Sequence, residues 1–184
     1  MTVVVDKQTA SPTPRIVLRP SNDDDVPAML DIYRHHIGQG VGNLGAFEPM
    51  PFDAEDLKAR RKNMRKHKLP HLVAVIDGAV AGYAYAVLFR KRPAYRFTVK
   101  HSIYVHPGRL NNGVGRALLP ALIEACAAGG FRQMIGYIDS ANLASLRLDE
   151  ACGFRRVGYL PAVAFRFGEW TDTVMVQRPI GPET

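Results

Sequence analysis

The residues between 102 and 130 combine types that could bind an anion. The segment reads SIYVHPGRLNNGVGRALLPALIEACAAGG, in which an apolar run ends at His106 and an apolar stretch of helical period follows Gly113, Val114 and Gly115. Glycines leave the main chain uncovered where the helix is expected to begin, and the free N–H groups and positive dipole end of a helix point outward there. The pattern therefore predicts an anion site between a strand and a helix.

Four readings of this glycine turn are open at this point. A P-loop requires lysine and then serine or threonine after its second glycine, but Arg116 and Ala117 stand there. A dinucleotide fingerprint requires a small third residue, and Leu118 is large, although Asp139 lies at a suitable spacing for a ribose contact. The third reading is the pyrophosphate turn of a coenzyme A enzyme, and the fourth is a tight turn without a ligand.

Hydrophobic periodicity and turn residues predict the elements that would position this turn. The expected elements are, in order, a strand at 15–20, a helix at 21–37, a loop at 38–52, a helix at 53–68, a hairpin of strands at 71–77 and 80–89, a strand at 95–107, a helix at 113–128, a strand at 132–139, a helix at 141–152 and two strands within 154–180. We expect Pro120 to kink or shorten its helix, because it cannot donate to the carbonyl of Arg116. An antiparallel meander combined with a crossover indicates an α+β fold with a mixed sheet.

Length and composition are those of one soluble domain. The chain has 184 residues, of which 47% are hydrophobic and 22% charged, which is typical of a globular protein rather than a disordered one. We interpret residues 1–14 as a flexible tail and residues 15–180 as the domain. No apolar run approaches the roughly 20 residues of a membrane span, and the N-terminus lacks a secretory signal pattern. Cys126 and Cys152 fall in apolar segments without metal-type spacing, so we expect two buried thiols and a cytoplasmic protein.

The net charge of +7 is concentrated in residues 58–68. That segment contains no acid, and its basic residues are Lys58, Arg60, Arg61, Lys62, Arg65, Lys66 and Lys68. A basic helix can bind nucleic acid or an acidic partner, but no aromatic residue interleaves with this one for base stacking. We expect a solvated helix face and no nucleic-acid partner, with docking of an acidic partner as the alternative.

Five blocks spread over most of the chain carry a resemblance to a known family. They read LRPSNDDDVPAMLDIYRHH, RPAYRFTVKHSIYVHP, NNGVGRALLPALI, SANLASLRLDEACGF and FRFGEWTDTVMVQR. In these blocks the chain resembles the GNAT family of N-acetyltransferases, and more narrowly its phosphinothricin and methionine sulfoximine acetyltransferase branch. The resemblance implies an α/β GNAT fold, with a mixed and mostly antiparallel sheet of about seven strands flanked by about four helices.

The resemblance also implies acetyl-CoA as the cosubstrate and no metal. The pantetheine arm would lie along a strand and the pyrophosphate in the glycine turn. The residues that match this coenzyme site are Ile103, Tyr104, Val105, Asn111, Asn112, Gly113, Val114, Gly115, Arg116, Asn142 and Ser145. Asn142 is explained equally well as a helix N-cap, and Ser145 as a helix-surface hydroxyl. Leu110 stands where the family has glutamine or arginine, so we expect weaker coenzyme binding.

The implied reaction is direct transfer of acetyl from the thioester to the primary amine of a small amino acid, such as phosphinothricin or methionine sulfoximine. The residues that match the substrate site are Arg90, Tyr95, Arg96 and Lys100. Lys100 replaces the glutamate proposed as base in this branch, and a lysine is protonated at neutral pH unless burial lowers its pKa. We expect a preference for more acidic acceptors than is usual in the branch.

Three residues are candidates for proton transfer in this reaction. His101 is the nearest titratable alternative to Lys100 as the base, but adjacent strand residues face opposite sides of a sheet, so only one of them can face the acceptor. Glu48 could reach the site if its loop folds over it, and a water relay is another possibility. Asp149 stands where the family commonly has a tyrosine or histidine acid, and an ionised carboxylate there would oppose a leaving thiolate.

The remaining expectations concern partners. Trp170 and Phe167 lie on the last strands, where family members often pair subunits, so a homodimer is expected, with core packing as the alternative. His35 and His36 have no cysteine or carboxylate spaced to complete a metal site. Two other functions stay open: a catalytically degenerate coenzyme A-binding module, and an acetyltransferase or regulator that docks a partner through residues 58–68.

Overall fold

The computed structural model describes residues 15–38, 53–166 and 168–182, which form a seven-stranded sheet in the order β1-β2-β3-β4-β5-β7-β6. The strands are β1 (Val17–Pro20), β2 (His71–Ile76), β3 (Ala79–Leu88), β4 (Thr98–Val105), β5 (Gln133–Asp139), β6 (Arg155–Arg166) and β7 (Glu169–Pro179). Neighbouring strands are antiparallel except for β4 and β5, which run parallel. The predicted mixed and mostly antiparallel sheet is confirmed.

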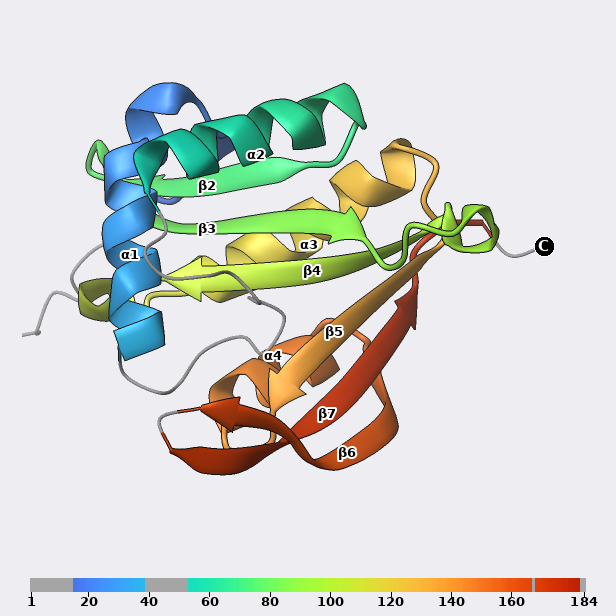
Figure 1. Ribbon diagram of the computed structural model, residues 1–184. Helices are drawn as coiled ribbons and strands as arrows, with labels where there is room; N and C mark the ends of the chain where they lie inside the picture. Colours follow the sequence, from blue (N-terminus) through green and yellow to red (C-terminus); the bar gives the residue numbers. More distant parts are fainter. Residues whose placement is uncertain (1–14, 39–52, 167, 183–184) are drawn as a thin grey trace, which may run out of the picture.

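Helices cover both faces of the sheet (Figure 1). The four helices are α1 (Val26–Gly38), α2 (Ala54–Lys66), α3 (Val114–Ala128) and α4 (Leu143–Ala151), and the single-turn 3-10 helices are η1 (Asp23–Asp25), η2 (Pro93–Tyr95) and η3 (Pro107–Arg109). On the face of α1 and α2, Met29 and Tyr33 pack on Tyr83. On the opposite face, Leu118 and Leu122 of α3 belong to the larger apolar core. Each face of the sheet therefore has its own core.

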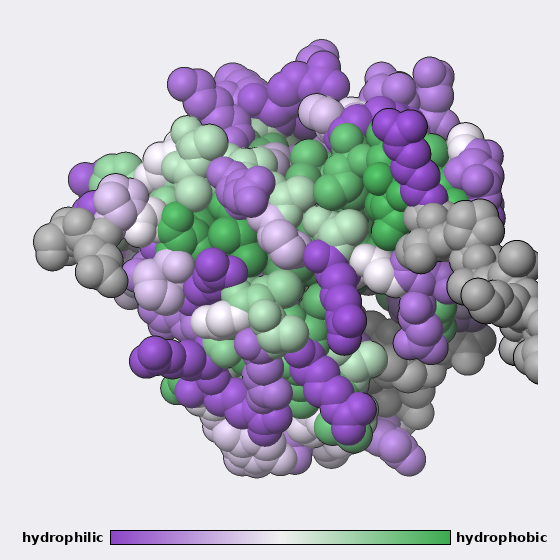
Figure 2. All heavy atoms as spheres, turned by 180° about the vertical axis from the view of Figure 1, so that it is seen from behind, coloured by the Kyte–Doolittle hydropathy of each residue, from purple (hydrophilic) through white to green (hydrophobic). Residues whose placement is uncertain are grey.

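Figure 2 shows the molecule from behind the view of Figure 1, with hydrophilic side chains (purple) along its upper and lower margins and apolar ones (green) between them. No helix in the described part of the chain is long and apolar enough to cross a membrane. Both cysteines are free; Cys126 is buried and Cys152 is only half-buried. Burial raises the pKa of the Cys126 thiol to about 12, so that thiol stays protonated and unreactive.

The start of α1 is fixed by a reciprocal cap and by one buried arginine. The Asn22 side chain accepts from the N–H of Asp25, and the Asp25 carboxylate accepts from the N–H of Asn22. Arg61 of α2 is only 4% exposed, donates to the Ser21 hydroxyl at 2.8 Å and forms an ion pair with Asp23. The expected solvated face of residues 58–68 is therefore wrong for Arg61, which joins α2 to η1.

Two predicted boundaries differ from the structure. Pro120 does not shorten its helix, because α3 continues through it to Ala128. The strand expected from residue 95 begins only at Thr98, since Pro93 starts a 3-10 turn in which the Arg96 N–H donates to the Pro93 carbonyl. The expected tail at 1–14 and loop at 38–52 lie outside the described residues, apart from Gly38, which ends α1.

The parallel strands β4 and β5 separate partway along their length. They pair at only three positions, the last of which joins Lys100 to Ile135. On its other side β4 stays paired with β3 as far as Val105, while β5 stays paired with β7 as far as Asp139. The two strands diverge beyond Lys100 (Figure 1), which opens the sheet at its centre.

Candidate functional site

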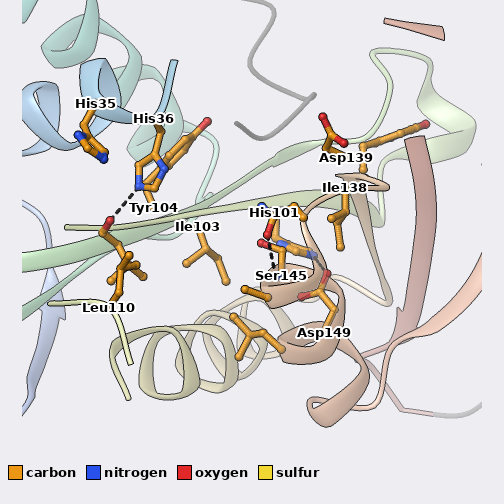
Figure 3. Close-up of a pocket in the computed structure, with 15 residues that line it drawn as sticks. His35, His36, His101, Ile103, Tyr104, Leu110, Ile138, Asp139, Ser145 and Asp149 are labelled. Atoms are coloured by element: carbon orange, nitrogen blue, oxygen red, sulfur yellow. Dashed lines mark hydrogen bonds and ion pairs between the residues drawn. The ribbon is translucent and has the colours of Figure 1, made fainter. Parts of the chain in front are cut away.

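A cleft of about 430 Å³ lies where β4 and β5 diverge. Its walls come from β4 on one side and from β5 and α4 on the other, and it is bordered by α1 and by the turn before α3 (Figure 3). The expected site residues that line it are Ile103, Tyr104, Val105, Asn142, Ser145, His101 and Asp149. The structure therefore brings together residues from β4 and α4 that are about forty positions apart in the chain.

Main-chain groups of β4 point into this cleft. Carbonyl and amide groups alternate between the two sides of a strand, and the Phe97 carbonyl accepts from Arg132 on the β5 side at 2.8 Å. Val105 lies an even number of residues after Phe97, so its carbonyl points to the same side of the strand, where it accepts from the ring Nε2 of His36 at 2.8 Å. The N–H groups of Ile103 and Val105 therefore face the side from which β5 has departed, and they are available to a ligand.

The glycine turn leaves the start of α3 without a side-chain cap. Gly113 is the N-cap residue at φ 79° and Asn111 lies at φ 62°, both in the left-handed region. The first helical bond in this turn runs from the Ala117 N–H to the Gly113 carbonyl at 2.9 Å. The N–H groups of residues 114–116 precede it and point out of the helix end. This arrangement suits an anion, as the pattern predicted.

Close packing beside the turn depends on a second glycine. A Cβ on Gly115 would lie 3.0 Å from a methyl carbon of Leu148 on α4. Leu148 lines the cleft, and Leu110, which is 53% exposed, lines it at the turn. Arg109 lies 3.9 Å from the carboxylate of Asp77, which makes a weak and exposed ion pair. The apolar side chain at position 110 therefore sits at the mouth of the cleft.

The start of α4 is capped by its own asparagine. The Asn142 side-chain oxygen accepts from the Ser145 N–H at 3.0 Å, which confirms the N-cap reading. Both residues also line the cleft, and the cap uses only the side-chain oxygen of Asn142, not its side-chain nitrogen. The N-cap and a ligand contact are therefore compatible.

His101 and Asp149 form a buried pair on the α4 side of the sheet. Asp149 is 1% exposed and His101 7% exposed, and their Nε2 and Oδ2 atoms are 3.3 Å apart. Neither atom has hydrogen-bond geometry with the other or with another described group, so the two side chains are close without being hydrogen-bonded. The ring of Phe154 packs edge-on to His101 at 5.1 Å. Figure 3 shows the two side chains extending toward each other from β4 and α4.

Gly136 on β5 makes room for this pair. A Cβ at this position would lie 2.6 Å from the His101 Nε2 and 3.2 Å from the Asp149 Oδ2. It would also lie 2.8 Å from a methyl carbon of Val176 on β7. No side chain can stand there without displacing the imidazole, so the strand requires glycine at this position.

Lys100 lies on the opposite face of β4 from His101. Its Nζ is 5.6 Å from the centroid of the Tyr137 ring, and Tyr137 lines the cleft. Burial lowers the pKa of Lys100, because desolvation penalises the ammonium form. Tyr104 shares this face, and burial keeps its phenol neutral by raising its pKa well above the usual value. The sequence expectation that Lys100 and His101 face opposite sides is confirmed.

Other candidates do not line the cleft. Arg90 and Arg96 are exposed on the connection from β3 to β4, each lying over the ring of a neighbouring phenylalanine at 5.1 and 4.4 Å, and Tyr95 lies between them on η2. Glu48 lies outside the described residues. His35 and His36 both line the cleft, and the described residues contain no group of three side chains that could hold a metal.

Sequence reasoning assigned no role to Tyr137, Ile138, Ala144 and Leu148, which line the cleft, or to Gly136 beside the buried pair. Gly136 was read only as part of a strand, although a glycine inside a strand often marks a close approach and was a usable signal. Tyr137 received no role, and its contact with Lys100 depends on how β4 and β5 pair, which no local pattern reveals. Asp139, weighed as a ribose contact, instead caps the turn after β5 by accepting from the Ala141 N–H at 2.9 Å.

Comparison with known proteins gives a consistent result for the whole domain. The acetyltransferase (GNAT) family model matches residues 31–154. A phosphinothricin N-acetyltransferase of Alcaligenes faecalis is 46% identical over 164 residues, covering 89% of this chain and 82% of the relative. An L-methionine sulfoximine/L-methionine sulfone acetyltransferase of Salmonella typhimurium is 32% identical, covering 88% and 93%.

Solved structures agree with the fold. A phosphinothricin acetyltransferase of Sinorhizobium meliloti in complex with acetyl-CoA has a TM-score of 0.84 at 40% identity, covering 90% of this chain and 89% of that one. A Salmonella typhimurium putative acetyltransferase with its cofactor acetyl-CoA has a TM-score of 0.84 at 31% identity, covering 90% and 94%. With its divided sheet and its uncapped α3, this chain belongs to the GNAT family of acetyltransferases.

Proposed function

We propose that this chain transfers the acetyl group of acetyl-CoA to the primary amine of a small, anionic amino acid. The observation that carries the proposal is the separation of β4 from β5 beyond Lys100, which leaves a cleft beside the uncapped start of α3. The names of the relatives support it, since they act on phosphinothricin and methionine sulfoximine. Phosphinothricin carries both a carboxylate and a phosphinate, so the related enzymes that are named for it accept an acidic amino acid.

The coenzyme would be held mainly by main-chain groups. The N–H groups of residues 112–116 would bind the diphosphate, because they combine free donors with the positive end of α3. The N–H groups of Ile103 and Val105 would bind the pantetheine arm as an added half-strand. Such contacts tolerate side-chain changes, so Leu110 would weaken binding rather than abolish it. Acetyl-CoA supplies an activated acyl group that an amine can attack directly.

The N–H groups of β4 would also stabilise the oxyanion that forms during transfer. A preformed donor in a site without water contributes most where charge develops. Ile103 and Val105 present such donors in the gap itself, and no covalent nucleophile is needed. The acceptor would approach from the face of Lys100 and Tyr137, on the opposite side of the sheet from α4.

The buried pair of His101 and Asp149 would supply a proton to the departing thiolate. The pair lies on the α4 side of the cleft, away from the acceptor face. The sequence raised the objection that Asp149 alone would repel a thiolate, but His101 lies 3.3 Å away and in its protonated form would offset that charge. This position favours a role for His101 as proton donor rather than as base. The amine proton would pass to water, or to Glu48 if its loop reaches the cleft.

Lys100 would select the acceptor by its charge. It presents a cation where the branch presents a carboxylate, so an additional anionic group on the acceptor gains a partner. Arg90 and Arg96 of the β3–β4 connection would add positive charge around the entrance. We therefore expect acidic amino acids to be better acceptors than neutral ones of the same size.

A homodimer would form through β6 and β7. β6 is at the edge of the sheet, and Trp170 is 65% exposed while it contacts the ring of Phe165 at 5.1 Å. The other exposed large apolar residues of β6 are Val157, Tyr159 and Val163. Exposed apolar groups at a sheet edge mark an interaction surface. Sedimentation of wild type against Trp170→Asp would test this, since the variant should sediment as a monomer; an unchanged mass would contradict it.

A panel of amines with acetyl-CoA tests the proposed function. Thiol release is followed with glutamate, phosphinothricin, methionine sulfoximine, methionine and spermidine as acceptors, and binding of acetyl-CoA is measured by calorimetry. The proposal predicts binding, and the fastest thiol release with the acidic amino acids. Binding without transfer to any amine would instead indicate a degenerate coenzyme-binding module, and a preference for spermidine would contradict the assigned acceptor class.

A further inference from the structure

Lys100 places a primary amine on the face of the sheet from which the acceptor is proposed to approach. It is the last residue of β4 that pairs with β5, opposite Ile135. Its Nζ lies 5.6 Å from the centroid of the Tyr137 ring, and Tyr137 lines the cleft. Lys100 does not itself line the cleft, but its half-buried side chain ends near Tyr137, which does.

The surroundings of this amine shift its protonation equilibrium toward the neutral form, although the cation is still present. Desolvation by burial lowers the pKa of Lys100, and no charged group among the described residues acts to raise it. An amine needs a free electron pair to attack a carbonyl carbon. At neutral pH a larger fraction of Lys100 has that electron pair than of a fully exposed lysine.

We propose that Lys100 is a self-acetylation site, whose Nζ takes the acetyl group of acetyl-CoA bound in the same molecule when no acceptor is present. The inference rests on the proposed function, because it requires the thioester to lie in the cleft between β4 and β5. It also goes further, since it makes one residue of the chain a substrate.

The reaction balances without any additional reactant. The neutral Nζ attacks the carbonyl carbon, a C–N bond forms, and the C–S bond breaks with its electron pair moving to sulfur. One proton leaves the nitrogen for water and one proton is added to the sulfur, so the products are acetyl-lysine and the coenzyme thiol. The N–H groups of Ile103 and Val105 that face the gap would stabilise the oxyanion here too.

Acetylation would remove the cation that is expected to bind an acidic acceptor. The modified enzyme would then bind acidic acceptors more weakly, while its binding of coenzyme through the turn at 112–116 would be unchanged. An acidic acceptor would in turn protect Lys100, because a carboxylate beside the amine favours the protonated form. Self-acetylation would therefore occur when coenzyme is plentiful and acceptor is scarce.

Mass spectrometry of the full chain tests the proposal. The protein is incubated with acetyl-CoA and no amine, and acetylation is mapped by peptide. Lys91, which is exposed on the connection from β3 to β4 and does not line the cleft between β4 and β5, reports acetylation away from the proposed coenzyme site. We expect Lys100 to be acetylated well before Lys91, at a rate per molecule that does not depend on protein concentration. Free coenzyme A should slow the reaction at Lys100 only, and glutamate should do the same.

The Lys100→Arg variant provides the matched control. It keeps the positive charge but cannot be acetylated in this way, so it should bind acetyl-CoA normally and lack the early acetylation. Transfer to an added amine and coenzyme binding are measured on the same preparations. If the protein binds coenzyme and transfers acetyl to an added amine, but Lys100 stays unmodified or is modified no faster than Lys91, self-acetylation is overturned and the proposed function is left intact. Failure to bind acetyl-CoA would overturn both.

Discussion

Replacing Asp149 with asparagine tests the role of the buried pair. Asp149→Asn keeps the size of the side chain and removes the charge that faces His101 at 3.3 Å. If His101 donates a proton to the leaving thiolate and needs the Asp149 carboxylate to hold its protonated form, Asp149→Asn should slow transfer from acetyl-CoA by about 10²–10⁴-fold, the effect of losing a positioned proton donor. That factor corresponds to about 3–5 kcal/mol of transition-state stabilisation.

The assay compares two thioesters that differ in their need for a proton. The thiolate of coenzyme A is basic, while that of para-nitrothiophenyl acetate departs unprotonated. Asp149→Asn should therefore slow transfer from acetyl-CoA and leave transfer from the nitrophenyl thioester close to wild type. His101→Gln should behave alike, and the double variant should lose little more than either single one, because the two residues act as a unit.

Structural damage would give a different result. Equal losses with both thioesters, or a loss of coenzyme affinity that matches the loss of rate, would refute the proton-donor role. His67→Gln is the matched control, since His67 follows α2 and does not line the cleft.

Gly136→Ala provides a second disturbance of the pair. Its Cβ would lie 2.6 Å from the His101 Nε2, so it should reproduce the selective loss and cost about 1–3 kcal/mol of stability.

Three further predictions concern stability and coenzyme binding. Burial lowers the pKa of His71 to about 3, so below about pH 6.5 the unfolded chain binds a proton that the folded chain does not. The free energy of unfolding should therefore fall by about 2 kcal/mol between pH 7 and pH 5 in urea titrations. A His71→Phe variant that loses as much stability in acid as the wild type would contradict this. Arg61→Ala should cost about 1–3 kcal/mol in the same titrations, because it leaves the buried Ser21 hydroxyl and carbonyl without their donor. A cost below that of the exposed control Arg65→Ala would show that the contact of Arg61 with Ser21 contributes little. Gly113→Ala should cost about 1 kcal/mol because its φ is 79° and should weaken acetyl-CoA binding in calorimetry, whereas unchanged affinity would separate the turn from the coenzyme.

The sequence predicted the elements well because their signals are local. Alternation, helical spacing and turn residues placed each strand and helix in the correct order, and the glycine turn predicted the uncapped start of α3 from its own residues. Asn142 was recognised as a possible cap for the same reason. The start of β4 was wrong because proline permits both an extended segment and a 3-10 turn, and Pro120 was judged by a helix rule that packing overrides.

The contacts between distant elements could not be predicted in this way. The pair of His101 and Asp149 depends on α4 packing against β4 and on the absence of a side chain at Gly136. The burial of Arg61 depends on a contact with residues forty positions earlier in the chain. Desolvation of Lys100, on which its chemistry depends, likewise follows from the way β4 and β5 pair, and a reference pKa gives no sign of it.

A crystal structure of the full chain with acetyl-CoA tests the central claim most directly. The account predicts that the diphosphate binds the amides at the start of α3 and that the arm lies between β4 and β5 alongside Ile103 and Val105. It also predicts that the sulfur lies nearer to His101 and Asp149 than to Lys100. A coenzyme bound elsewhere, or a cleft closed by its own side chains at saturating acetyl-CoA, would contradict it.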